Sequence, residues 1–249
     1  EALSDIPFPR GCQLVTKCAT ELRMKRGAAF KAVISLTWDK AQPADAGAVG
    51  SIEELGEKIE KLTDALLAAS GATFEKEHSI LIELEAPSVP DLTVIDLPGI
   101  VRTSVEGQDA GVIEDVGNLI NKYLQRDRTI ILAVIPCNVD IATVDILERA
   151  RNVDPAGDRT IGVLTKPDLI DKGAEAEVIS VLRGIRKPLK LGYTILKNRS
   201  QQQIDKGISL AEAKAEETGW FSQQDPFKEL KPELFGVDNL SQRLTAVLV

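Results

Sequence analysis

Apolar residues along the chain fall into two patterns, short continuous runs and stretches in which they recur roughly every three to four positions. The runs predict strands at residues 20–25, 29–37, 79–85, 92–95, 129–135, 160–165 and 193–196. The periodic stretches predict helices at residues 52–67, 111–125, 141–152, 174–184, 210–217 and 238–249, with a loop at 38–50. Strands that alternate with amphipathic helices favour an α/β fold with a doubly wound, mostly parallel sheet flanked by helices.

The composition agrees with this class of fold, and the net charge argues against some classes of binding partner. Only 4% of the 249 residues are aromatic, so aliphatic side chains must build the core, as in a sheet covered on both faces. The net charge of −8 argues against direct binding of nucleic acid or anionic lipid. Cys12, Cys18 and Cys137 lack C-x-x-C spacing and predict free thiols, and no apolar run reaches the about 18 residues of a membrane span. We therefore expect a soluble cytoplasmic protein.

The first stretch with recognisable chemistry is Asp96-Leu97-Pro98-Gly99, directly after the predicted strand at 92–95. This D-x-x-G arrangement is typical of P-loop nucleotide phosphohydrolases. The carboxylate of Asp96 can hold Mg²⁺, and the N–H of Gly99 can contact a γ-phosphate. Taken alone, the stretch is equally well explained as a Pro-Gly turn after a strand.

Two further motifs change that balance. Thr165-Lys166-Pro167-Asp168 follows the strand at 160–165, and a [T/N]-K-x-D motif recognises guanine, because its carboxylate accepts the ring N–H and the exocyclic amine together. Asn198-Arg199-Ser200-Gln201 follows the strand at 193–196, where GTPases place a last base-contacting loop. We expect the three strand tips, at Ile95, Leu164 and Leu196, to converge on one pocket for a guanine nucleotide.

Several longer stretches resemble the dynamin superfamily of large GTPases, particularly its Mx (myxovirus-resistance) branch. They are Phe8-Pro9-Arg10-Gly11 with Val15-Thr16-Lys17-Cys18, the run PDLTVIDLPG from Pro90 to Gly99, and the run from Val134 to Gly173 that contains Asn138-Val139-Asp140-Ile141-Ala142-Thr143. The likeness covers nearly the whole chain and is weakest at residues 38–73. It implies that residues 1–249 are one dynamin-type GTPase domain with the P-loop NTPase fold.

The resemblance also implies a role for each residue that matches a family motif. Thr16 would bind Mg²⁺ and orient the attacking water, Asp96 would hold the metal, and Gly99 would contact the γ-phosphate. Base recognition would fall to Thr165, Lys166, Asp168, Asn198, Arg199 and Gln201. Family members pair across their nucleotide sites, so Asp140 would brace the phosphate loop of a second copy and Asp171 would reach its base.

The chain departs from the family pattern in one loop. Gly11-Cys12-Gln13 stands where the family has Gly-Ser-Gly, in a loop whose carbonyl groups hold a monovalent cation, K⁺ or Na⁺. Gln13 restricts the backbone more than glycine does, so we hypothesise slower turnover. Equal K⁺ stimulation of the natural sequence and a Gln13→Gly variant would refute this. Ile100 offers no side chain to position water, which is normal for the family.

The sequence contains no G-x-x-x-x-G-K-[S/T] phosphate-binding loop, which in the family ends just before the match to Glu1-Ala2-Leu3-Ser4. Losing about four phosphate contacts removes about 6–12 kcal/mol, whereas micromolar binding amounts to about 8 kcal/mol. We expect this 249-residue chain alone to bind GTP poorly. The domain is therefore interpreted as incomplete at its N-terminus, with stalk and effector regions outside the chain.

The function implied is hydrolysis of GTP to GDP with Mg²⁺, in a mechanochemical protein that remodels membranes or restricts viruses. Partners would be a second copy, through the GTPase face, and membranes or viral components through absent regions. The full-length protein would be cytoplasmic, and the resemblance leaves open whether it also associates with membranes. One alternative is a nucleotide-free interaction domain or degenerate fragment without activity; another is a different P-loop enzyme such as an ATPase. His78, Trp38, Trp220 and the acidic cluster at 212–217, interpreted as a solvated helix face, receive no catalytic role.

Overall fold

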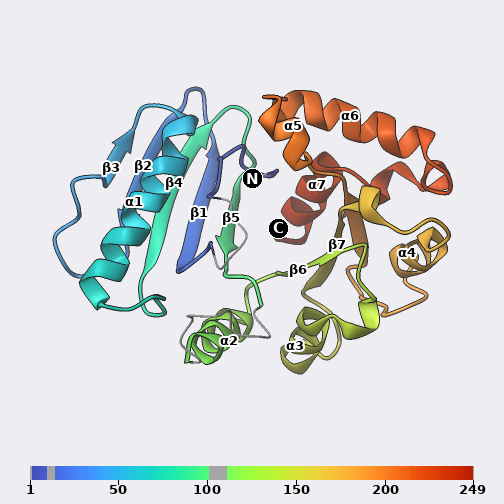
Figure 1. Ribbon diagram of the computed structural model, residues 1–249, viewed down its shortest axis with the longest axis horizontal. Helices are drawn as coiled ribbons and strands as arrows, with labels where there is room; N and C mark the ends of the chain where they lie inside the picture. Colours follow the sequence, from blue (N-terminus) through green and yellow to red (C-terminus); the bar gives the residue numbers. More distant parts are fainter. Residues whose placement is uncertain (1, 10–14, 101–110, 249) are drawn as a thin grey trace. The chain divides into compact units, whose positions relative to one another are not determined.

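The computed structural model describes residues 2–9, 15–100 and 111–248 (Figure 1). The chain divides into two compact units, Glu1–Lys122 and Tyr123–Val249, which we describe separately. Among the described residues, no helix combines the length and the apolar composition needed to cross a bilayer.

The first unit is built on a five-stranded sheet with the order β3-β2-β4-β1-β5. The strands are β1 (Ala19–Arg26), β2 (Lys31–Leu36), β3 (Gly47–Val49), β4 (Ser79–Ala86) and β5 (Leu92–Asp96). Strand β1 pairs parallel with β4, and the other pairs are antiparallel. The direction of β5 follows from a short connection. Only residues 87–91 join β4 to β5, whereas a parallel crossover needs about a dozen or more residues, so β5 runs opposite to β4 and is therefore antiparallel to β1.

Helix α1 (Ile52–Ser70) lies against this sheet, in contact with β2, β3 and β4 (Figure 1). Its buried side chains recur with helical spacing, at Leu55, Ile59, Leu62 and Leu66. The helix ends at Gly71, which adopts the left-handed conformation and donates its N–H to the carbonyl of Leu67. Helix α2 (Gly111–Leu124) then leads to the second unit.

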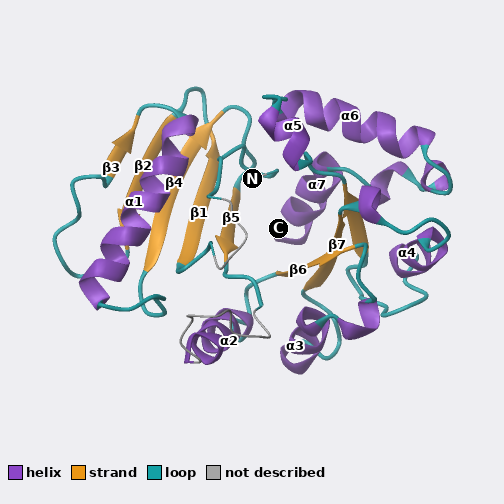
Figure 2. Ribbon diagram, viewed as in Figure 1, coloured by secondary structure: helices purple, strands orange, loops and turns teal. Residues whose placement is uncertain are grey.

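The second unit contains a parallel sheet of β6 (Ile131–Pro136), β7 (Thr160–Thr165) and β8 (Tyr193–Leu196), in that order. The remaining helices of this unit are α3 (Asp145–Val153), α4 (Glu175–Leu182), α5 (Gln201–Asp205), α6 (Leu210–Gln223) and α7 (Val237–Leu248). Short 3₁₀ turns lie at η1 (Ile141–Thr143), η2 (Pro167–Leu169), η3 (Phe227–Glu229) and η4 (Pro232–Leu234). Figure 2 shows the helices packed around the strands, which is why every residue of β8 is buried.

The predicted α/β class is confirmed by this arrangement, and the sheet of the second unit is parallel and flanked by helices, as predicted. In the described part of the first unit the strands form a separate sheet, in which only β1 and β4 pair in parallel. The predicted strand at 193–196 has the bounds that β8 shows, and 160–165 those of β7. The loop predicted at 38–50 contains the short strand β3. The single helix predicted at 141–152 is divided into η1 and α3, because Val144 between them is extended.

Gly162 of β7 provides a test of the packing in the second unit. It is the register partner of Tyr193 in β8, and a Cβ atom added to it would lie 2.0 Å from the Tyr193 ring. Because Tyr193 is 1% exposed and cannot move into solvent, we expect Gly162→Ala to lower the free energy of unfolding by about 1–3 kcal/mol. Urea titration followed by circular dichroism measures this change.

Gly219 in α6 is the matched control for this substitution. A Cβ atom added there would meet nothing within 4 Å, so Gly219→Ala should raise the free energy of unfolding by about 0.5–1 kcal/mol. If both variants unfolded at the same urea concentration, the packing of Tyr193 over Gly162 described here would be wrong.

Candidate nucleotide site

In the first unit, the structure brings Thr16 and Asp96 together. Asp96 is the last residue of β5, and the hydroxyl of Thr16 donates a hydrogen bond to its carboxylate. Burial raises the pKa of Asp96, and the Thr16 hydrogen bond opposes that shift. The segment after Thr16 is fixed by the carbonyl of Lys17, which accepts from the N–H of Glu75 at 2.9 Å. The pair is thus held on the edge strand of the sheet.

These two side chains fit the chemistry of Mg²⁺. A carboxylate and a hydroxyl are hard oxygen donors, and Mg²⁺ in proteins commonly takes only one or two protein ligands, with water and phosphate oxygens completing its shell. Within the described residues, no cluster of three or more His, Cys, Asp or Glu side chains could hold a metal by itself. Asp96 and Thr16 can supply one or two of the oxygen ligands of such an ion.

Gly99 lies three residues beyond Asp96 and is exposed. A Cβ atom added there would contact nothing within 4 Å, so packing within the protein gives no reason for glycine. Glycine at this position leaves the backbone open to close approach by a ligand. Residues Gly11, Cys12 and Gln13, on which the monovalent-cation hypothesis depends, lie outside the described residues.

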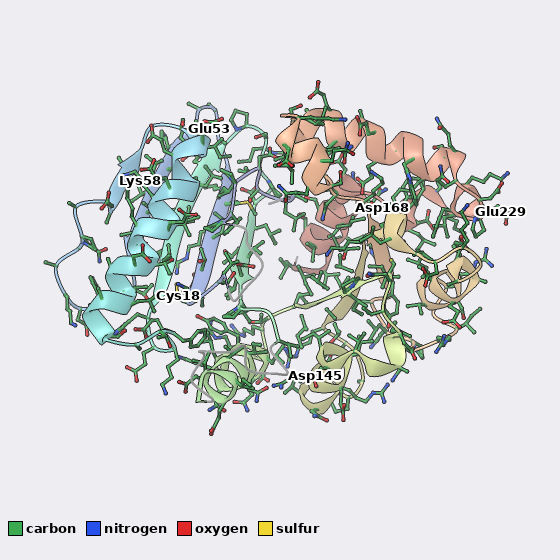
Figure 3. The ribbon with its side chains drawn as sticks, viewed as in Figure 1. Cys18, Glu53, Lys58, Asp145, Asp168 and Glu229 are labelled. Atoms are coloured by element: carbon green, nitrogen blue, oxygen red, sulfur yellow. The ribbon has the colours of Figure 1, made fainter. Side chains whose placement is uncertain are left out.

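In the second unit, the base-reading motif sits in a tight turn at the end of β7. Thr165 is the last residue of the strand, and Lys166 adopts the left-handed backbone conformation with φ of 56°. For a residue other than glycine this conformation costs about 1–2 kcal/mol, and such strain concentrates at functional sites. The turn leaves Lys166 and Asp168 exposed while Pro167 is buried between them (Figure 3 labels Asp168).

The loop after β8 lies beside this turn. Thr165 and Leu196 are register partners in adjacent parallel strands, so the two loops start next to each other at the same edge of the sheet. Asn198 is exposed. Arg199 donates a hydrogen bond to the carbonyl of Ile208 at 2.7 Å, and this bond stabilises the loop. The structure thus brings together two of the three predicted strand tips.

Helix α5 completes this loop. Ser200 caps the helix in a reciprocal capping box with Gln203, which fixes where the loop ends. Gln201 is the first helical residue and is exposed, with its amide bonded to Asp205 at 2.9 Å. The prediction that Asp96 shares one pocket with Asp168 and Asn198 stays a prediction, because the two residues after β7 and β8 belong to one unit and Asp96 to the other.

Asp140 and Asp171 line one cavity of about 260 Å³ in the second unit. Asp140 accepts from the N–H of Ala142 at 2.9 Å and lies 3.9 Å from the guanidinium of Arg186. Cys137 also lines this cavity, and burial together with the nearby Asp168 carboxylate raises the pKa of its thiol to about 12. The thiol is therefore protonated near neutral pH and is a poor nucleophile.

The interpretation of residues 212–217 as a solvated helix face is wrong for Glu217. This side chain is 3% exposed, and its carboxylate accepts from the backbone N–H groups of Lys197, at 2.8 Å, and Val237, at 3.2 Å. The sequence held a signal for this, because Glu217 stands four residues before the buried Phe221 and so shares its face of α6. Counting acidic residues along the segment obscured that spacing.

Comparison with known proteins identifies the class to which these features belong. Residues 1–167 match the family model described as "Dynamin family", and residues 177–249 match "Dynamin central region". The chain therefore belongs to the dynamin family.

The similar curated proteins include Mx proteins of several vertebrates. The chain is 43% identical to "Interferon-induced GTP-binding protein Mx2" of Homo sapiens, over 100% of the chain and 34% of that protein. It is 42% identical to "Interferon-induced GTP-binding protein Mx1" of Equus caballus, over 100% of the chain and 37% of that protein. It is 40% identical to "Interferon-induced GTP-binding protein Mx" of Perca fluviatilis, over 100% of the chain and 81% of that protein. The chain thus spans about a third of the length of the first two relatives.

Proposed function

We propose that this chain is most of the GTPase domain of an Mx-related, dynamin-family protein, and that the full-length protein binds and hydrolyses GTP. The observation that supports the proposal is the pairing of Thr165 with Leu196, because the loops that carry the exposed Lys166, Asp168 and Asn198 both start at the carboxyl ends of these adjacent parallel strands. In α/β proteins this edge of a sheet is where ligands bind. Names of the relatives that include GTP binding are consistent with it.

Guanine recognition is assigned to the loops after β7 and β8. The carboxylate of Asp168 accepts hydrogen bonds from the ring N–H and the exocyclic amine of guanine, a donor pair that adenine lacks. The aliphatic stem of Lys166 lies along the face of the base. Thr165, Asn198, Arg199 and Gln201 complete the two loops, with Arg199 acting through its bond to Ile208.

Phosphate chemistry is assigned to the first unit. Asp96 and Thr16 would hold Mg²⁺, which would supply positive charge to offset the negative charge of the phosphates. Thr16 orients the attacking water, and the N–H of Gly99 donates to the γ-phosphate. The new bond joins the water oxygen to the γ-phosphorus, the bond to the bridging oxygen breaks, and GDP and inorganic phosphate leave.

Self-association is assigned to the face of the second unit that carries the Asp140–Asp171 cavity. Both carboxylates would contact a second copy of the chain, Asp140 at its phosphate loop and Asp171 at its base. We place the full-length protein in the cytoplasm, where regions outside this chain would reach membranes or viral components.

Phosphate release by the full-length protein tests this function. With GTP and Mg²⁺ we expect steady turnover that stops when EDTA removes the metal. The rate per protein molecule should rise with protein concentration, because more copies then pair. The absence of both GTP turnover and GDP binding in the full-length protein would favour a nucleotide-free interaction domain.

A further inference from the structure

Glu217 is a buried carboxylate that the proposed chemistry does not use. Both of its oxygens accept backbone hydrogen bonds, Oε1 from Lys197 at 2.8 Å and Oε2 from Val237 at 3.2 Å. Lys197 follows the last residue of β8 and precedes Asn198, and Val237 is the first residue of α7. One side chain of α6 therefore fixes the entry to the base loop and the start of another helix.

Glu217 is itself held on a rigid support. One turn further along α6, Phe221 is fully buried and stacks on Phe235 with ring centroids 4.8 Å apart. Phe221 also meets Phe227 edge-on at 6.0 Å. Because this aromatic cluster anchors α6 against the core, the carboxylate is presented to Lys197 from a fixed position.

The base loop is fixed at its other end as well. Arg199 bonds the carbonyl of Ile208, and Ser200 forms the capping box of α5. Between these anchors and Lys197 only Asn198 is left to face solvent. The position of Asn198 beside the Asp168 turn is therefore set by a short segment tied at both ends.

We propose that Glu217 is a positioning residue for guanine binding, which holds the N–H of Lys197 so that Asn198 projects toward the base that Asp168 reads. The inference rests on the proposed function. A carboxylate suits the task because it accepts from two N–H groups at once. A glutamine of the same shape has one acceptor oxygen, and its NH₂ group would face a second donor, which leaves one buried N–H unpaired.

Steady-state kinetics of the full-length protein test this role. For Glu217→Gln we expect the KM for GTP to rise about tenfold, because a misplaced base loop weakens base binding. The kcat should stay within about twofold, because the residues assigned to phosphate chemistry lie on other elements. Glu217→Asp keeps the charge but reaches less far, so its KM should lie between those of Glu217→Gln and the natural protein.

Two control variants separate positioning from loss of stability. Glu229→Gln makes the same change at an exposed carboxylate of η3 and should leave KM unaltered. Leu240→Ala removes a side chain of α7 that is 2% exposed, and should lower the melting temperature without raising KM. If Leu240→Ala raised KM as much as Glu217→Gln, the effect would be general destabilisation and the inference would be overturned.

The remaining outcomes also decide the matter. A KM for Glu217→Gln within about twofold of the natural protein would overturn the inference while the proposed function stood. If Glu217→Gln does not fold, Glu217→Asp decides in its place, with an unchanged KM counting against the inference. Absence of GTP turnover in the natural full-length protein would overturn the proposed function and this inference together.

Discussion

Substitution of Asp168 by asparagine is expected to lower the affinity of the full-length protein for GTP by about 100-fold or more. Two hydrogen bonds to a charged acceptor contribute about 1.5–3 kcal/mol each, and each 1.4 kcal/mol corresponds to about tenfold in affinity. The same variant should gain affinity for xanthosine triphosphate, since the asparagine NH₂ can donate to the carbonyl that replaces the exocyclic amine of guanine. Isothermal titration calorimetry with GTP and with xanthosine triphosphate measures both affinities.

Asp158→Asn is the matched control for that experiment. Asp158 is an exposed carboxylate that pairs with Lys190 ahead of β7, at the opposite end of the strand from Asp168. Its replacement should leave both affinities unaltered. If Asp168→Asn bound GTP as tightly as the natural protein, the assignment of Asp168 to the base would have to be abandoned.

Substitution of Thr16 by alanine is expected to lower kcat for GTP by about 10²–10³, with a smaller effect on KM. The hydroxyl that bonds Asp96 is the group we assign to the metal and the attacking water, and loss of one such contact to the reacting centre typically costs about this much. Thr16→Ser keeps the hydroxyl and should retain most of the activity. Single-turnover phosphate release separates the chemical step from binding.

Thr37→Ala serves as the control, because the hydroxyl of Thr37 also bonds a neighbour, Ser79, in the same unit. Its loss should affect stability and leave kcat near that of the natural protein. Equal kcat values for Thr16→Ala and Thr37→Ala would show that the Thr16 hydroxyl takes no part in hydrolysis.

The sequence was sufficient wherever structure depends on local pattern. Strands β7 and β8 are continuous apolar runs that end at polar motifs, so both their bounds and the positions of Thr165 and Asn198 could be predicted. Strand β3 could not, because its three residues are extended through pairing with β2 and form no apolar run of their own. The antiparallel direction of β5 was available from the short connection at 87–91, a signal that the repeating strand–helix alternation obscured.

The features of the site that could not be predicted from the sequence also depend on contacts between separate segments of the chain. Thr16 and Asp96 were assigned separately from motifs, and their hydrogen bond became visible only when β5 was placed beside the segment before β1. The helix predicted at 141–152 is divided because Val144 is extended, after a 3₁₀ turn that the side chain of Asp140 caps by accepting from the N–H of Ala142. Glu217 was missed because its burial depends on what covers α6, which no count of charges reveals.

The central claim is that the loops after β7 and β8 select guanine. Displacement of a fluorescent GDP from the full-length protein by GTP, ITP and ATP tests it directly. ITP lacks only the exocyclic amine, so we predict that it displaces about 10–100-fold less strongly than GTP, and that ATP is weaker still. Equal displacement by GTP and ATP would contradict the account.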